Sequence, residues 1–237
     1  PSYGTAVVDP ARPSLGGVQH MSRQLFHSST NALARASLFG GVFILAGLGY
    51  LGWIWAHSSY MTGEKVVLNQ PVPFSHDHHT AGLGIDCRYC HTSVEESNSA
   101  GIPPVQTCMN CHNIMWNRED MLAPVRDAYR SGETIEWNRV YDLPDYVYFD
   151  HSIHVNKGIG CESCHGRVDR QPLIYQAESL QMKWCLDCHN SPEDYIRPRD
   201  EIYTFGYEPE GDRLALAHEL IEEYDVAPGI DCGVCHR

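Results

Sequence analysis

All ten cysteines of this 237-residue chain fall into one short pattern, and that pattern limits the possible folds more than any other feature. Each pair has the form C-x-x-C-H, with two residues between the thiols and a histidine directly after the second. From the composition, chance would produce about 0.02 such motifs. The chain contains five, which are numbered here in chain order: Cys87/Cys90/His91, Cys108/Cys111/His112, Cys161/Cys164/His165, Cys185/Cys188/His189 and Cys232/Cys235/His236.

The spacing of these motifs suits covalent attachment of haem. Residues i and i+3 share one face of a helical turn, so both thiols can add to the two vinyl groups of one haem. The adjacent histidine then supplies the proximal iron ligand. Zinc ribbons and disulfide scaffolds also use many cysteines, but neither requires a histidine after every second one. The sequence therefore predicts five covalently bound haem c groups, with proximal ligands His91, His112, His165, His189 and His236.

An uncharged apolar segment precedes all five motifs. Residues 36–56 carry no charged side chain, and 21 helical residues at about 1.5 Å each cover a bilayer core of about 30 Å. Trp53, Trp55 and Tyr60 follow at its far end, as in an interfacial aromatic belt. A cleaved signal peptide is the alternative, but its apolar region would be shorter and would end in small residues. The pattern favours an uncleaved single-pass anchor in the cytoplasmic membrane. The arginine-bearing N-terminal side would lie in the cytoplasm and the motifs on the periplasmic side.

The charge is distributed unevenly along the chain. The chain has 17 Lys and Arg against 30 Asp and Glu, and residues 58–237 alone carry a net charge of −15. A nucleic-acid-binding protein needs a basic face, so this composition argues against nucleic acid as a partner. A basic or neutral protein partner is expected instead.

A second repeated segment precedes two of the motifs. Residues 74–79 and 149–154 both have the form F-x-H-x-x-H and lie 75 positions apart, whereas the last motif has no such segment before it. The two histidines of each segment are three residues apart on one helical turn, so one pair can reach two irons on either side of the helix. We expect all four to be sixth iron ligands: His76, His79, His151 and His154.

Little regular structure is expected outside these segments. The predicted fold is mostly α-helical and irregular, with little β structure, and is preceded by one transmembrane helix. About 36 residues per haem leave no room for conventional cores, so the haems themselves must supply buried apolar surface. Further helices are predicted over 117–132, with Asn117 as the N-cap, and over 212–224, with one apolar face made of Leu214, Ala217, Leu220, Ile221 and Tyr224. The expected divisions are a cytoplasmic tail (1–35), the anchor (36–57), a two-haem module with a connecting helix (58–140) and a three-haem module (141–237).

These modules resemble the small class III multihaem cytochromes. Residues 108–197 resemble more closely the pentahaem subunit of alternative complex III, through CMNCHNIMWNREDMLAPVRDAY and LQMKWCLDCHNSPEDYIRP, and the closing CGVCHR agrees as well. In the class III pattern, the first histidine of a pair ligates the next haem and the second histidine ligates the one after it. The resemblance therefore implies that His76 and His79 serve motifs 1 and 2, and that His151 and His154 serve motifs 3 and 4.

The fifth haem has no such histidine. In the class III pattern, the final haem takes its ligand a few residues before the middle motif, which implies Met182. A thioether ligand raises the potential of a haem relative to imidazole, so this haem would be the most oxidising and a natural exit for electrons. His218 is the rival ligand, and Met115 and Met121 are further alternatives.

The resemblance also implies a function. Alternative complex III is a membrane quinol oxidoreductase, in which this subunit would relay electrons from quinol oxidation to a periplasmic carrier or terminal oxidase without itself being an enzyme. Its partners would be an iron–sulfur subunit, polytopic quinol-binding subunits and a monohaem cytochrome or soluble carrier. Two other functions stay open: a multihaem enzyme with an open iron position, and a small anchored quinol dehydrogenase-type donor to a periplasmic reductase.

Overall fold

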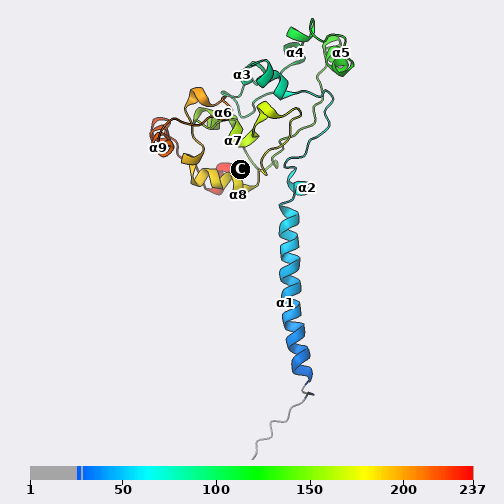
Figure 1. Ribbon diagram of the computed structural model, residues 1–237, viewed down its shortest axis with the longest axis vertical. Helices are drawn as coiled ribbons and strands as arrows, with labels where there is room; N and C mark the ends of the chain where they lie inside the picture. The colour runs from blue at the N-terminus through cyan, green and yellow to red at the C-terminus, as the bar shows by residue number, and fades with distance from the viewer. Residues whose placement is uncertain (1–25, 28, 237) are drawn as a thin grey trace, which may run out of the picture. The chain divides into compact units, whose positions relative to one another are not determined.

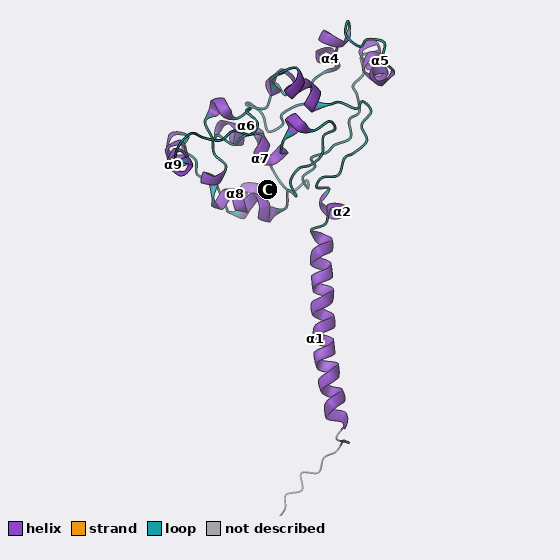
Figure 2. Cartoon of the chain, in the orientation of Figure 1, coloured by secondary structure: helices purple, strands orange, loops and turns teal. Residues whose placement is uncertain are grey.

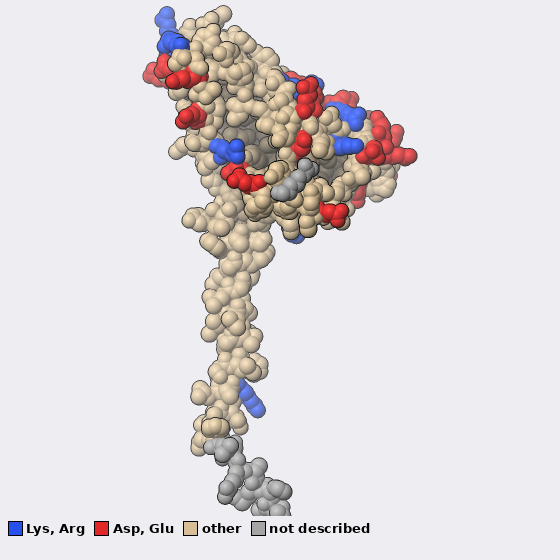
Figure 3. Space-filling model, turned by 180° about the vertical axis from the view of Figure 1, so that it is seen from behind, with Lys and Arg blue, Asp and Glu red and all other residues tan. Residues whose placement is uncertain are grey.

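The computed structural model describes residues 26, 27 and 29–236, which divide into two compact units between Leu51 and Gly52. The predicted tail (residues 1–35) lies mostly outside the described residues. Helix α1 (Ser29–Ala56) is continuous over 28 residues and is long and apolar enough to cross a membrane (Figure 1). It begins seven residues before the uncharged segment does. Its one charged residue, Arg35, lies near its N-terminal end, and the rest of its surface is bare of charge (Figure 3).

The second unit consists of short helices joined by loops (Figure 2). No β-strand occurs in the part of the chain that the structure describes, and the two isolated bridges join Val67 to Tyr175 and Ile159 to Ile196. The predicted fold class is therefore confirmed. In chain order the helical elements are α2 (Ser59–Thr62), η1 (Asp77–Gly82), α3 (Cys87–Cys90), α4 (Val105–His112), η2 (Asp120–Leu122), α5 (Ala123–Ser131), α6 (His151–Asn156), α7 (Glu162–His165), η3 (Val168–Arg170), α8 (Met182–Asn190), η4 (Pro192–Asp194), η5 (Arg199–Glu201), α9 (Arg213–Glu223) and α10 (Cys232–Cys235).

The helix predicted over 117–132 is shorter than expected. Its end is correct, because Gly132 follows it in the left-handed conformation at φ 75°. Its start is wrong: a 3-10 turn occupies Asp120–Leu122, and the α-helix begins only at Ala123. Pro124 explains the difference. Proline has no amide hydrogen to donate and is tolerated in the first turn of a helix but not in its interior.

The helix predicted over 212–224 is confirmed as α9. The side chain of Asp212 accepts hydrogen bonds from the amides of Leu214 and Ala215 and so caps its first turn. Ala217, Leu220 and Tyr224 are buried as the periodicity predicts. Leu214, predicted for the same face, is instead 54% exposed.

The protein core of the second unit is small and divided. Thirteen apolar residues are buried in the described part of the chain. Twelve of them form three separate clusters, and Ala177 belongs to none of these. The first cluster joins α4 and α5, the second packs α9 against Ile196, and the third joins Val94, Val155 and Ile202. Cores of this size do not support a domain of this length by themselves. The division of residues 58–237 into two modules stays a prediction.

Candidate haem sites

Each C-x-x-C-H motif lies on a single helical turn, so its two thiols face the same side. In motif 1, for example, the amide of His91 donates to the carbonyl of Cys87 at 2.8 Å, and His165 and His236 repeat this bond within motifs 3 and 5. All ten cysteines lie in the described residues and none forms a disulfide. Across the same residues, no group of three or more His, Cys, Asp or Glu side chains converges as a zinc site would. We call the motifs, with their nominated sixth ligands, sites 1 to 5.

The ten thiols differ in exposure, although the sequence prediction treats them as equivalent attachment residues. Cys111 and Cys232 are exposed, whereas the other eight cysteines are half-buried. In motif 2, Cys108 packs against the apolar cluster of α4 and α5, but that cluster does not include Cys111, one turn later. The thiol of Cys111 therefore lies at the surface, as that of Cys232 does. Haem attachment at Cys111 stays a prediction, which rests on the spacing of the motif.

Histidines from distant parts of the chain face one another in pairs. Ring centroids are 6.2 Å apart for His79 and His112, 6.3 Å for His151 and His165, and 6.2 Å for His154 and His189. Two imidazoles on opposite sides of one metal ion would have centroids about 6.3 Å apart, given metal–nitrogen bonds of about 2.0–2.1 Å. The rings in sites 2, 3 and 4 therefore have the separation that a six-coordinate haem iron requires.

Site 1 brings its two histidines together as well. Burial lowers the pKa of His76 to about 4, and the neighbouring His91 and His79 rings contribute to this shift. The Nδ1 atom of His76 is buried without a hydrogen-bond partner among the described residues. Burial also lowers the pKa of His165, again to about 4, and the pKa values of His79 and His154 fall for the same reason. A neutral imidazole is the form that binds a metal, so these environments favour ligation.

Backbone carbonyls orient most of these imidazoles. When Nδ1 donates its proton to a carbonyl, Nε2 is left free to bind iron. The Nδ1–oxygen distances are 2.7 Å for His79 to Ser75, 2.7 Å for His91 to Gly101, 2.8 Å for His151 to Asn98, 2.7 Å for His154 to Asp150, 2.7 Å for His189 to Gly229, and 3.1 Å for both His112 to Met115 and His236 to Tyr146.

The phenylalanine of each F-x-H-x-x-H segment fixes both of its histidines. Phe74 stacks on His79 at 4.4 Å between ring centroids and meets His76 edge-on at 4.8 Å. Phe149 repeats this arrangement in the second segment, at 4.6 Å and 4.8 Å. Each pair is thus held at fixed mutual orientation by one aromatic ring.

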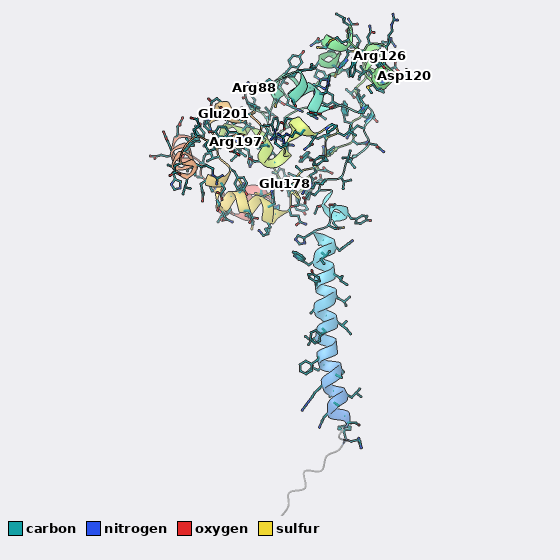
Figure 4. All side chains as sticks on the ribbon, in the orientation of Figure 1. Arg88, Asp120, Arg126, Glu178, Arg197 and Glu201 are labelled. Atoms are coloured by element: carbon teal, nitrogen blue, oxygen red, sulfur yellow. The ribbon has the colours of Figure 1, made fainter. Side chains whose placement is uncertain are left out.

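A buried ion pair supports site 3 from the side. Arg197, labelled in Figure 4, donates from Nη2 to Oε1 of Glu162 at 2.9 Å and from Nη1 to the carbonyl of Thr204 at 3.1 Å. Glu162 lies between the two thiols of motif 3. A Cβ atom at Gly160 would collide with the guanidinium, so a larger residue directly before this motif would displace Arg197 from its ion pair.

Site 5 is the most open of the five. The His236 ring lies 5.7 Å from that of Tyr146, and the amide of Tyr148 donates to the carbonyl of Cys235 at 2.8 Å. Met182, the first residue of α8, is 66% exposed, and His218 is exposed on α9. Within the described residues, no hydrogen bond or ring contact joins His218 to His236. The start of α8 is fixed by Gln181, whose side-chain amide donates to the carbonyl of Ala56 at 3.1 Å.

Three other histidines of the described chain lie outside these sites. His78 is exposed and stacks on Trp116 at 5.6 Å, while Nδ1 of His57 donates to the carbonyl of Trp53 at 2.8 Å, at the end of α1. His27 contacts Ser29. His20 lies outside the described residues.

The residues present fit haem. The paired rings have the required spacing, their Nδ1 protons are directed away from the metal position, and the protein core alone is too small for the unit. The motifs and the histidine pairs could be found from the sequence. The role of Phe74 and Phe149 was visible only as an unexplained repeat, and the carbonyl acceptors leave no signal because every residue has a carbonyl.

Comparison with known proteins identifies two segments. Residues 56–136 match the class III cytochrome c family, and residues 147–237 match the family of cytochrome c7 and related cytochrome c. A curated relative is the "Menaquinone reductase, multiheme cytochrome c subunit" of Nitratidesulfovibrio vulgaris (strain Hildenborough). It is 31% identical over 159 residues, which cover 58% of this chain and 74% of the relative.

Proposed function

The chain belongs to the class III-like multihaem cytochromes c, and we propose that it is the membrane-anchored, five-haem electron-transfer subunit of a quinol-oxidising complex. Haem c bound to such a protein supplies reversible one-electron chemistry at its iron. The protein would bind each haem, supply its iron ligands and determine the polarity of its surroundings. The observation that carries the proposal is the facing of histidine rings at 6.2–6.3 Å across sites 2, 3 and 4.

The proposed ligands leave no iron position open for a substrate. The proposed sixth ligands are His79, His151 and His154 in sites 2, 3 and 4, whose rings face the motif histidines, and His76 in site 1, which neighbours His91. We propose Met182 for site 5. Its support is that α8 lies beside motif 5, because His189 on α8 bonds through Nδ1 to the carbonyl of Gly229, three residues before that motif, at 2.7 Å. A multihaem enzyme needs an iron with an open position, so this ligand set favours electron transfer.

The setting we propose is alternative complex III. There the chain would relay electrons from quinol oxidation to a periplasmic carrier or terminal oxidase, beside an iron–sulfur subunit, polytopic quinol-binding subunits and a monohaem cytochrome. Helix α1 would anchor the chain in the cytoplasmic membrane, with the sites on the periplasmic side. The support is the sequence resemblance of residues 108–197 and the length and apolar character of α1.

A second setting has support of its own. The relative from N. vulgaris is named as a subunit of a menaquinone reductase, so its complex delivers electrons to a quinone. A chain of this kind would share the anchor and the haem sites but would conduct in the opposite direction. A small anchored quinol dehydrogenase-type donor to a periplasmic reductase belongs to the same group of quinone-linked functions.

Purification of the native complex from its membrane separates these settings. Haem c attachment is tested first, by the mass of the chain and by alkylation after denaturation. Five haems and no alkylated cysteine are expected. The exposed Cys111 is the cysteine at which alkylation is checked first. A free thiol at any motif would contradict the proposal.

The copurifying subunits and the preferred direction then decide the setting. Reduction of the haems by a menaquinol analogue, in a complex that contains a monohaem cytochrome, supports alternative complex III. Reoxidation of prereduced haems by a menaquinone analogue supports the reductase.

A further inference from the structure

The five sites do not follow one another in space as they do in sequence. The motif helices of sites 1 and 2 contact each other directly, because the side-chain amide of Asn110 in motif 2 donates to the hydroxyl of Tyr89 in motif 1 at 3.0 Å. The two sites also share one turn of chain, which carries His76 and His79. On its other side, site 2 borders the small apolar cluster that joins α4 and α5, through Cys108.

Site 3 contacts site 1, and not site 2. The loop that follows motif 1 holds His151, since both the amide and Nδ1 of His151 are bonded to the carbonyl of Asn98, at 3.3 Å and 2.8 Å. The same loop provides Gly101, which orients His91.

A second link joins these two sites from the other side. Gln171 is 1% exposed, and its side-chain amide donates to the carbonyl of His165 at 3.1 Å. Its backbone carbonyl accepts from the amide of Asp77, next to His76, at 3.3 Å. No hydrogen bond, ion pair or ring contact among the described residues joins motif 2 to motif 3.

Sites 3, 4 and 5 continue in chain order. His151 and His154 lie on the single helix α6 and face sites 3 and 4. His189 of site 4 is oriented by the carbonyl of Gly229, three residues before motif 5, at 2.7 Å. Figure 1 shows the same succession, with α4 and α5 at one end of this unit, α3, α6 and α7 between, and α8 with the C-terminus at the other end.

We propose that the five sites are arranged in the order 2–1–3–4–5, so that sites 2 and 5 are the two ends of the relay and sites 1 and 3 connect its two halves. This inference rests on the proposed haem attachment. Redox partners then exchange electrons at site 2 or site 5, and site 1, although first in the sequence, is internal to the relay. A relay in sequence order would instead begin at site 1 and would need a contact between sites 2 and 3.

The histidine pair on one turn provides a matched test. His76→Ala opens the iron of site 1, and His79→Ala opens that of site 2, with all thioether bonds retained. A high-spin ferric iron speeds the relaxation of unpaired electrons on nearby irons, and this effect weakens steeply with distance. Low-temperature EPR power saturation of the full-length haem-loaded chain therefore counts the nearest neighbours of each opened site.

The expected result is that His76→Ala accelerates relaxation in two low-spin signals and His79→Ala in one. The opposite pattern, or equal effects, overturns the proposed order. The mass of each variant reports haem attachment separately, so a chain with fewer than five haems contradicts the proposed function and not the order. If an alanine variant does not fold, His76→Met and His79→Met retain a ligand. Redox titration of these variants then counts the neighbouring haems whose reduction potentials shift. Two are expected for His76→Met and one for His79→Met.

Discussion

The ring of Phe149 stacks on the ring of His154, with centroids 4.6 Å apart and planes inclined by 28°. Phe74 and His79 reproduce this contact 75 residues earlier, at 4.4 Å and 24°. Because each phenylalanine also meets the other histidine of its segment edge-on, one ring determines the orientation of two nominated ligands that belong to different sites.

Phe149→Leu should therefore disturb sites 3 and 4 together. Loss of the aromatic contact allows both imidazole planes to rotate and costs about 1 kcal/mol of unfolding free energy. Broadened low-spin EPR signals of two haems, with no high-spin signal, are expected, together with a lower denaturation midpoint. Tyr148→Leu is the control, since this neighbouring side chain is exposed. A Phe149 variant with unchanged EPR signals would show that the ring only fills space.

The sequence is enough to nominate the ligands but not to describe their surroundings. The five motifs and the two histidine pairs are short-range patterns, and their chemistry depends on spacing along one helical turn. The exposure of Cys111 and the contacts between sites, such as that of His151 with the Asn98 carbonyl, depend on tertiary structure, and no local pattern records them. The start of α5 was predicted too early for a different reason: Asn117 is a suitable N-cap residue by type, but Pro124 is tolerated only in the first turn of a helix.

His151→Ala should open one iron and leave all thioether bonds intact. The expected result is a new high-spin ferric signal and an unchanged mass of bound haem, because the cysteines rather than the sixth ligand hold the group. His78→Ala is the matched control, because His78 is exposed. Its ring contacts Trp116 and the adjacent His79. A high-spin signal in the His78 variant, or none in the His151 variant, would contradict the nominated ligands.

Met182→Leu tests the ligand of site 5. The native protein should show the weak near-infrared absorption of a methionine–iron bond, and the variant should lose it along with the highest reduction potential. Met115→Leu and Met121→Leu serve as controls and should keep both properties. If the native protein has no such absorption, Met182 is not the ligand, and His218→Ala becomes the variant expected to produce a high-spin signal.

Glu162→Ala should destabilise the haem-loaded chain by about 3 kcal/mol, because it leaves the buried Arg197 guanidinium without its charged partner. The double variant Glu162→Leu/Arg197→Met removes both charges and should recover much of this loss. Guanidinium chloride unfolding followed by tryptophan fluorescence measures the difference. Asp127→Ala breaks an exposed pair with Arg130 and should change stability by less than about 1 kcal/mol. A similar effect of Glu162→Ala and Asp127→Ala would contradict the buried role of the pair.

The acidic surface should affect association with redox partners. Figure 3 shows Asp and Glu side chains spread over one face of the second unit, with fewer Lys and Arg among them, and residues 58–237 carry a net charge of −15. Association with a basic electron carrier should therefore slow as ionic strength rises, since screening shortens the range of attraction to about 10 Å at 0.1 M. Stopped-flow reduction at several salt concentrations measures this dependence. A rate that does not change with salt would show that these charges do not guide the encounter.

The position of each nominated sixth ligand relative to its motif has a consequence for biogenesis. His76, His79, His151, His154 and Met182 all precede the motifs they are proposed to serve, by between 10 and 50 residues along the sequence. In the proposed topology, the chain would be translocated behind α1 with its N-terminal side first, so the nominated sixth ligand of every site would reach the periplasm before the cysteines of that site. Each newly attached haem would then find its nominated ligands already available, and maturation would proceed site by site while the rest of the chain is still crossing the membrane.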